Sequence, residues 1–310
     1  MCPVLVFAIH GVNMRRTLIG LGLMGLFLLA PSVLMAKTPE GDWLTSRELL
    51  STSRGYGVAN AMVASSAGTT AVWHNPAGIA SAMMYSVDAG YMYEHDDEGH
   101  GFEVNVVDMK SNPYVGAGFG FVYQHGSVNG KAQHLVHTRL GIAVPLAKNL
   151  ISLGVTGAYS YIKYDGKKLL SQFTMDTGII VRPLEWLAVA FAAQNLIVGD
   201  YKAYMPRTMS FGAMAGSIDW GINVMFEASF NISAKDIADT GSYGVGLEYV
   251  LRRLVPIRLG YRYECDDHHV LAVGLGYRHQ EGIFGLDIAY QHHFADTSNE
   301  LLSGSLNFYF

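Results

Sequence analysis

Five charged residues in the last third of the chain alternate with apolar residues, a spacing that would bring them together on one face of neighbouring strands. Such a set could form a polar conduit, a wall on which another segment docks, or pairs that simply neutralise one another. No nucleophile motif such as G-x-S-x-G accompanies them, so they indicate no catalytic chemistry, and we expect no enzyme activity. The five residues are Glu248, Arg258, Arg262, Arg278 and Asp287.

Acidic and histidine side chains also gather in three short stretches. These are EHDDEGH (residues 94–100), ECDDHH (residues 264–269) and the pair His292 and His293. Carboxylates bind calcium-like ions and imidazoles bind zinc-like ions. The stretches lack the tight ligand spacing of a metal site, and polar loops that face water are the ordinary case. We therefore assign no metal ligand and no cofactor.

The segments that carry these charges have the period of β-strands. In IRLGYRYE, residues 257–264, the side chains of Ile257, Leu259 and Tyr261 share one face, while Arg258 and Arg262 share the other. The same alternation occurs in VLAVGLGYR, IFGLDIAYQ, YGVGLEYVL, FTMDTGIIV and WGINVMFEASF. Each segment has one continuous apolar face, and the opposite face is mainly glycine, alanine, serine and isolated charges.

Two all-β architectures could accommodate such strands. A soluble sandwich would hide the apolar faces in its core, whereas a transmembrane barrel would turn them towards lipid and keep the charges inside. A composition with 15% charged residues, 50% hydrophobic residues, 35 Gly and 18 Tyr favours the barrel. An Arg or Lys on the lipid face at mid-depth costs ~2–4 kcal/mol, so the charges belong in the lumen.

The pattern predicts a transmembrane antiparallel β-barrel of about 14 strands. Short connections are expected after even-numbered strands (AKN, RP, SI and HQE), and longer ones after several odd-numbered strands, as in outer-membrane barrels. The expected strands are residues 85–94, 101–109, 114–124, 132–145, 150–164, 169–182, 184–195, 207–216, 219–231, 242–251, 256–264, 269–278, 282–291 and 300–310.

Both ends of the chain indicate export to the cell outer membrane of a Gram-negative-type cell. Arg15 and Arg16, an apolar run over residues 18–30 and the sequence PSVLMA have the anatomy of a signal peptide. We expect residues 1–36 to be removed after Ala36, with Met14 as a possible true start. The chain ends in LNFYF, and the terminal Phe310 resembles the signal that the barrel-assembly machinery recognises. The net charge of -5 and the lack of a basic block argue against a nucleic-acid partner.

Residues 37–82 remain between the signal peptide and the barrel, residues 83–310. They are too few for an independent core, and we interpret them as a small N-terminal hatch or plug in the lumen. Within them, Asn75, Pro76, Ala77 and Gly78 form a compact turn motif. Proline fixes φ, asparagine accepts local backbone hydrogen bonds, and the two small residues allow close packing. An ordinary turn into the first strand is the simpler alternative.

The stretch SRGYGVANAMVASSAGTTAVWHNPAGIA, residues 53–80, resembles the N-terminal segment of the long-chain fatty-acid transporter (FadL) family and of the PorV-type barrels. MDTGIIVRP, AAQNL and MPRTMSFGA further resemble phrases of PorV-type barrels. The resemblance implies a barrel of about this strand number with a luminal hatch. The large outer loops of fatty-acid transporters have no counterpart of comparable size in this sequence.

Two functions follow as expectations from these observations. The first is passive transport of hydrophobic, fatty-acid-like molecules through a hatch-plugged barrel that is embedded in outer-membrane lipid. The alternative is a PorV-type outer-membrane partner in protein secretion or surface attachment. Hydrophobic small molecules would be the partners in the first case and secreted proteins in the second.

Overall fold

The structure, a computed structural model, describes residues 50–95, 98–128, 130–147, 150–197, 205–217, 221–234, 237–265, 268–294 and 299–310. The expected signal peptide and the first part of the expected hatch, residues 37–49, lie outside these ranges. Within them, every helix is too short or too polar to cross a membrane.

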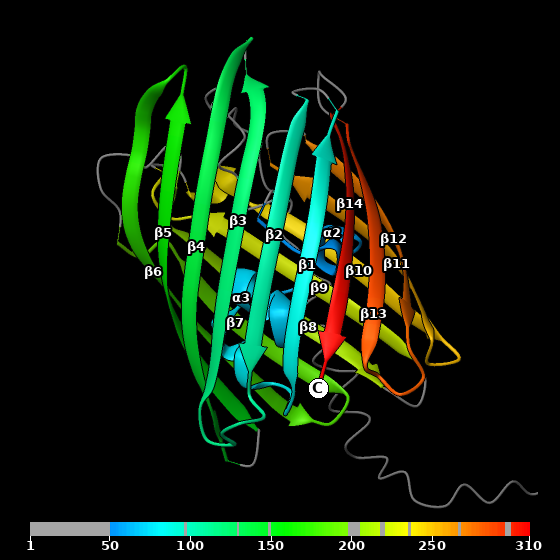
Figure 1. Cartoon of the computed structure of the whole chain (residues 1–310). Coiled ribbons are helices and arrows are strands. Elements are labelled where there is room, and N and C mark those ends of the chain that lie inside the picture. Colours follow the sequence, from blue (N-terminus) through cyan, green and yellow to red (C-terminus); the bar gives the residue numbers. More distant parts are fainter. Residues whose placement is uncertain are drawn as a thin grey trace, which may run out of the picture. The chain divides into compact units, whose positions relative to one another are not determined.

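Fourteen antiparallel β-strands form most of the described part of the chain (Figure 1), which confirms the all-β fold class and the strand number. They are β1 (Tyr85–Glu94), β2 (Gly99–Asp108), β3 (Gly116–Val128), β4 (Lys131–Leu146), β5 (Ile151–Tyr164), β6 (Lys167–Leu184), β7 (Leu187–Gln194), β8 (Thr208–Ser217), β9 (Ile222–Asn231), β10 (Ser242–Leu251), β11 (Val255–Glu264), β12 (His269–Arg278), β13 (Phe284–His293) and β14 (Asn299–Tyr309).

The strands close into a barrel in which each pairs with its neighbours in sequence and β14 pairs with β1. The closing pair is antiparallel, with Gly90 opposite Ser305 and Ser86 opposite Tyr309. Closure leaves no unpaired strand edge, because the backbone groups of the first and last strands satisfy one another.

The two faces of each strand differ as the period-two pattern predicts. On β11, Leu259 is 51% exposed and Tyr261 is 44% exposed, whereas Arg258 is 1% exposed and Arg262 is 4% exposed. The apolar side chains therefore point away from the barrel and the charged ones point into it. This inverted arrangement is the one that an apolar surrounding medium requires.

Residues 50–82, called here the N-terminal segment, lie inside the barrel. They form four short helices: α2 (Ser53–Tyr56), η3 (Gly68–Thr70), α3 (Ala71–His74) and η4 (Pro76–Ala80). Helix α2 contacts β12, β13 and β14, η3 contacts β1 and β2, and η4 contacts β3, β4, β5 and β6. Nearly all residues from Leu50 to Ala80 are buried. The segment therefore packs against strands on opposite sides of the barrel.

Two strand boundaries depart from the sequence prediction in an informative way. Pro183, expected between the sixth and seventh strands, belongs to β6, and the pairing of β6 with β7 shifts between Val181 and Leu184. The proline is tolerated because it falls in this irregular stretch, where its missing N–H breaks no regular ladder bond. In addition, β3 continues to Val128, four residues beyond its expected end.

We call the end of the barrel that carries the longer connections, after β7 and β9, the loop side. Strands β3 to β6 extend far on this side because the strands themselves are long, while the turns that join them are short. β4 has 16 residues and β6 has 18, while β5 and β6 are joined only by Asp165 and Gly166. The longer connections follow β7 and β9, as expected. Consequently the wall made by β3 to β6 carries its own outward-facing side chains up to the strand tips.

Candidate functional site: the luminal segment and its cavity

The turn of residues 75–78 is held by its own asparagine. Asn75 caps η4 by accepting a hydrogen bond from the Ala77 N–H at 3.1 Å, and its Nδ2 donates to the Val63 carbonyl at 2.9 Å. Pro76 is the first residue of η4, a position where a missing N–H costs nothing. All four residues of the motif are buried. One amide side chain thus joins two parts of the N-terminal segment.

Two glycines of the barrel wall allow this turn to approach the strands. A Cβ at Gly154 of β5 would overlap the backbone of Pro76 and Ala77, and a Cβ at Gly178 of β6 would overlap Oδ1 of Asn75. Only glycine permits backbone contact at this distance. The turn is therefore seated directly against β5 and β6.

Charged side chains of the inner wall satisfy backbone groups of the N-terminal segment. Glu227 accepts hydrogen bonds from the Met62 and Val63 N–H groups at 3.0 and 2.9 Å. Arg262 donates to the Ala59 carbonyl from Nε at 2.8 Å and from Nη2 at 2.6 Å. The segment has little regular structure, so these charge-assisted bonds supply partners that a helix or sheet would otherwise provide.

A continuous chain of ion pairs links the segment to β10, β11 and β13. Arg54 of α2 donates to both carboxylate oxygens of Glu248 at 3.2 Å, and Arg258 donates to Glu248 at 2.7 Å. Arg258 also donates from Nη1 to Asp287, which accepts a further bond from Asn307 at 3.1 Å. Glu248 therefore links Arg54 of the N-terminal segment to Arg258 of the barrel wall.

The other two members of the expected charge set have different positions. Arg278 Nη2 lies 3.8 Å from Glu248 Oε2, and the Arg278 side chain is 39% exposed. Arg278 is therefore at the edge of this series of ion pairs. Arg262 makes its bonds to the segment, as described above. The set thus combines mutual pairing with docking, two of the three interpretations that the sequence left open.

Trp73 occupies the centre of the site and is fixed on three sides. Its Nε1 donates to Asn105 Oδ1 at 2.7 Å, and its carbonyl accepts from Arg139 Nη1 at 2.9 Å and from Gln194 Nε2 at 2.8 Å. The Arg139 guanidinium lies 5.3 Å from the centre of the indole ring and also pairs with Asp176 at 3.1 Å. The indole is therefore a rigid, preorganised surface.

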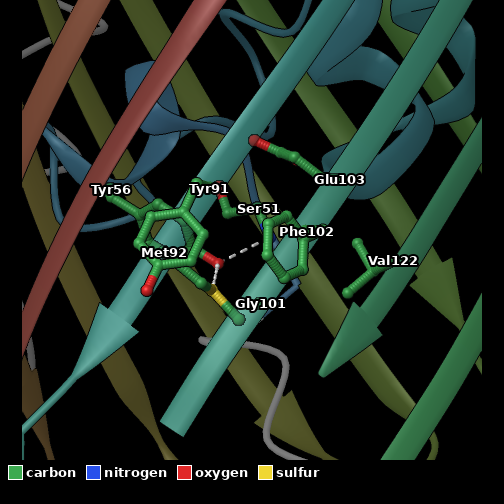
Figure 2. Close-up of a pocket in the computed structure, with 8 residues that line it drawn as sticks. All are labelled: Ser51, Tyr56, Tyr91, Met92, Gly101, Phe102, Glu103 and Val122. Carbon is green, nitrogen blue, oxygen red and sulfur yellow. Dashed lines mark hydrogen bonds between the residues drawn. The ribbon is translucent and has the colours of Figure 1, made fainter. Parts of the chain in front are cut away.

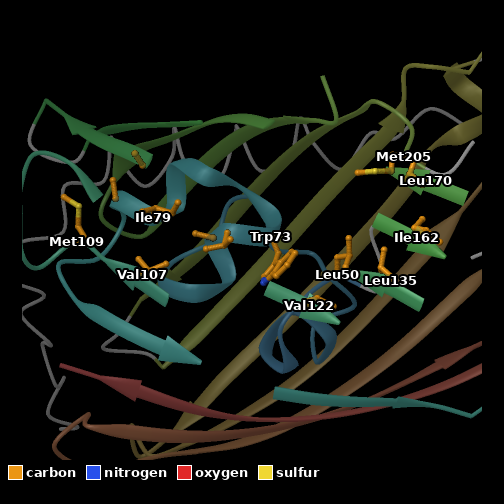
Figure 3. Packing of buried hydrophobic residues seen from close by; sticks show 14 residues of the cluster. Leu50, Trp73, Ile79, Val107, Met109, Val122, Leu135, Ile162, Leu170 and Met205 are labelled. Atoms are coloured by element: carbon orange, nitrogen blue, oxygen red, sulfur yellow. The ribbon is translucent and has the colours of Figure 1, made fainter. Parts of the chain in front are cut away.

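A cavity of about 60 Å³ lies beside Trp73, between the segment and strands β4, β5, β7 and β8. One side is polar, with His137, Arg139, Ser160 and Gln194. Figure 3 shows the apolar side chains that line its other side, which are Leu50, Trp73, Leu135, Ile162 and Met205. A mainly apolar lining with a few placed polar groups is the chemistry of a small-molecule site.

A second, smaller pocket of about 10 Å³ lies at β1 and β2 (Figure 2). It is lined from inside by Ser51, Tyr56 and Glu103, and from the outer face by Tyr91 and Phe102. The Tyr56 hydroxyl accepts from the Ser51 N–H at 3.3 Å and donates to Met92 Sδ at 3.2 Å. These bonds hold α2 against the wall, and the small volume leaves little space for a ligand.

The described residues contain no group of three or more His, Cys, Asp or Glu side chains that could hold a metal ion. Of the three stretches considered in the sequence, Asp96, Asp97, Asp266 and Asp267 lie outside the described residues. No metal ligand is assigned.

Sequence reasoning did not identify the partners of Trp73 or the cavity beside it. Trp73 and Arg139 are 66 residues apart and meet only through the barrel. Arg54 pairs with Glu248 across 194 residues of sequence. The local signal was glycine at inward positions: Gly116, Gly118 and Gly120 of β3 predict that the segment packs there, and a Cβ at Gly120 would lie 2.9 Å from Trp73 Cζ2.

No protein-family model matches this chain, and no curated protein has significant sequence similarity to it. Solved structures with the same fold do exist. The CymD monoaromatic hydrocarbon channel is 11% identical, with a TM-score of 0.65 over 84% of this chain and 97% of that chain. The Ralstonia pickettii toluene transporter TbuX is 11% identical, with a TM-score of 0.60 over 82% of this chain and 97% of that one.

The Pseudomonas putida toluene transporter TodX is 10% identical to this chain, with a TM-score of 0.55 over 89% of it and 99% of the transporter. All three likenesses span nearly the whole of the other protein. The described part of the chain therefore has the fold of this channel and these two transporters, a 14-strand barrel, as the resemblance to the fatty-acid transporters implied.

Proposed function

We propose that this protein is an outer-membrane channel through which small hydrophobic molecules pass the N-terminal segment. The observation that carries the proposal is the cavity beside Trp73, which combines an aromatic face with aliphatic side chains from the segment and the wall. The fold adds support, because CymD is described as a monoaromatic hydrocarbon channel and TbuX and TodX as toluene transporters.

The chemistry of the cavity suits a small apolar molecule. At about 60 Å³ the cavity is smaller than an engineered apolar cavity of roughly 150 Å³ that binds benzene in another protein, so the proposal requires the N-terminal segment to move as a ring enters. Burial of apolar surface would supply the affinity, at roughly 25 cal/mol per Å². The polar groups around Trp73 are hydrogen-bonded to one another, so they would orient a ligand that carries no charge.

In this proposal the N-terminal segment acts as a hatch. Its buried residues and its bonds to the wall obstruct an aqueous path through the lumen. The cavity is a binding site for an apolar molecule on that path. Residues 75–78 form the seat of the hatch on β5 and β6, and Glu248, Arg258 and Asp287 anchor α2 on the other side.

The test places a bulky residue on the inner face or on the outer face of the same strand, β4. Leu135→Trp would fill the cavity, since Leu135 lines it and is 2% exposed. Leu140→Trp is the matched control, because Leu140 is on the outer face of β4 and is 66% exposed. We expect toluene uptake into cells that express Leu135→Trp to fall to the level of cells without the protein, with Leu140→Trp unchanged.

Equal uptake by both variants would contradict a role for the cavity. Wild-type protein that folds in the membrane but supports no uptake of toluene or fatty acid would contradict the transport function itself. That second result would favour the alternative, a partner in protein secretion or surface attachment.

The chain end supports a further part of the proposal, recognition by the barrel-assembly machinery. Phe308 and Phe310 are 41% and 59% exposed, on the outer face at the end of β14. An aromatic terminus that stays accessible beside the β1–β14 seam can be bound during assembly. Phe310→Ala is expected to reduce the amount of folded protein in the outer membrane, whereas Leu302→Ala, also outward on β14, is the control.

A further inference from the structure

Five basic side chains form a row across five adjacent strands on the outer face of the barrel. The strand register places His100 of β2 opposite His125 of β3, His125 opposite His134 of β4, and His134 opposite Lys163 of β5. Lys163 in turn is opposite Lys168 of β6. We call these five residues the basic row. At ~4.8 Å per strand, it extends over roughly 19 Å.

The basic row faces outward, directly above an aromatic level of the wall. Its members are exposed except for half-buried His134. One level further from the strand tips, Phe102 is opposite Tyr123, and Val136 is opposite Tyr161. Strands β2 to β6 lie side by side in Figure 1, on the side where the wall is tallest. Aromatic side chains at this level are typical of a membrane interface.

The three histidines are each held through Nδ1. That atom contacts the Tyr91 hydroxyl at 2.6 Å in His100 and the Tyr123 hydroxyl at 3.0 Å in His134. In His125 it donates to the Gln133 carbonyl at 3.3 Å. The rings of His125 and His134 are also stacked, with centroids 4.5 Å apart. The wall therefore uses one nitrogen of each imidazole and leaves Nε2 for a partner outside the barrel.

The charge of the basic row is not balanced within the wall. Among the residues that the structure describes, no carboxylate forms an ion pair with Lys163 or Lys168. Nearby Lys131, by contrast, pairs with Asp165 at 3.2 Å. Inside the lumen, Arg139 and Arg258 are likewise paired with acids, and Arg262 is bound to a backbone carbonyl. An uncompensated row of donors at one level points to an anionic partner at that level.

We propose that the basic row binds the phosphate groups of anionic membrane lipids in the leaflet on the loop side. The aromatic level below it fixes the height at which headgroups meet the wall. Phosphate oxygens accept from the ammonium groups of Lys163 and Lys168 and from imidazole N–H groups, with His125 donating from Nε2 in its protonated form. This inference rests on the proposed location of the barrel in a membrane, but not on the cavity or on transport.

The experiment compares two charge-matched double variants. Lys163→Gln with Lys168→Gln removes two members of the basic row. Lys110→Gln with Arg252→Gln removes two exposed bases at the opposite strand ends. Each protein is reconstituted in nanodiscs of phosphatidylcholine with one tenth phosphatidic acid. Retained lipids are then counted by native mass spectrometry after detergent release.

Wild-type protein and the Lys110/Arg252 variant should retain phosphatidic acid in excess of its share of the bilayer. The Lys163/Lys168 variant should lose this enrichment by about tenfold, since basic side chains at an anionic surface each add to the attraction. His125→Gln with His134→Gln should cause a smaller loss in the same assay.

Equal enrichment in the two charge-matched variants, or none in the wild type, would overturn the proposal. Reconstitution in phosphatidylcholine alone separates it from the membrane location on which it rests. A barrel that enters those bilayers and shows the heat-dependent gel shift of a folded barrel, yet retains no excess of phosphatidic acid from the mixed bilayers, contradicts the basic row only. A chain that enters neither bilayer contradicts the membrane location.

Discussion

Gly178 of β6 lies against the side-chain amide of Asn75, with no space for a Cβ between them. The same amide caps η4 and binds the Val63 carbonyl. A residue of the barrel wall with no side chain thus sets the position of a turn that organises the luminal segment. This relationship makes the seat of the segment sensitive to a single methyl group.

Gly178→Ala is expected to displace the turn. Extra carbon in a closely packed site costs about 1–3 kcal/mol when the neighbours cannot move. Asn75 cannot move away easily, because it is bonded within the segment. Limited proteolysis should therefore cut residues 50–82 faster in this variant. Gly304→Ala on β14 is the control, since its Cβ would be 3.8 Å from the nearest atom, an ordinary contact. Equal cleavage of both variants would show that the seat tolerates the methyl group.

Gly118→Leu tests the packing of the segment on β3. A Cβ at this position would lie 3.0 Å from Ile79 Cδ1 and 3.1 Å from Val72 Cγ2, and leucine adds three further carbons. We expect impaired assembly or a displaced segment, measured as folded yield and as protease accessibility. Phe119→Leu, on the outer face of the same strand with 43% exposure, should behave as wild type. A normal yield and a normal cleavage pattern for Gly118→Leu would refute this packing.

Deleting residues 50–80 should open the lumen. The strands pair only with one another, so the barrel is expected to keep its heat-dependent gel shift. Single-channel conductance in planar bilayers should rise well above that of the intact protein, because ions would then meet a water-filled interior lined by charges. A folded barrel with unchanged conductance would show that the segment does not obstruct the path.

Glu248→Gln should destabilise the protein far more than loss of a surface pair. It leaves Arg258, whose side chain is 0% exposed, without its full counter-charge. Loss of one partner from a buried pair costs about 3–5 kcal/mol. Asp165→Asn, which breaks an exposed pair with Lys131, should cost about 0–1 kcal/mol. The temperature at which the folded gel form disappears measures both. Similar shifts in the two variants would mean that the buried ion pairs contribute little.

The strand pattern could be predicted from the sequence because lipid and lumen impose opposite demands on alternate residues. A slip by one residue would turn Arg258 and Arg262 towards lipid, so the faces of β11 are strongly specified. The number of strands follows from counting such segments. The end of β6 could not be predicted in the same way, since Pro183 looks like a strand terminator until the irregular pairing at that point is known.

The site depends on the register between strands, which single segments do not encode. Nothing near Trp73 in the sequence indicates that Arg139 and Gln194 will meet its carbonyl. The basic row is a clearer case. Its five members occur in five different strands, and only the pairing of those strands aligns them.

The attachment of α2 to the end of the chain constrains the order in which the protein can fold. Ser53 Oγ lies 2.7 Å from Ser303 Oγ, and Gln291 donates to the Tyr56 carbonyl at 2.8 Å, across 250 and 235 residues of sequence. These contacts cannot form until β13 and β14 have been delivered, and the pairing of β14 with β1 then encloses the segment. Seating of α2 and closure of the seam are therefore late, coupled events, and contacts of such separation make folding slow. A chain arrested before β13 would lack these bonds from α2 to β13 and β14, so α2 can be anchored only after the last strands are in place.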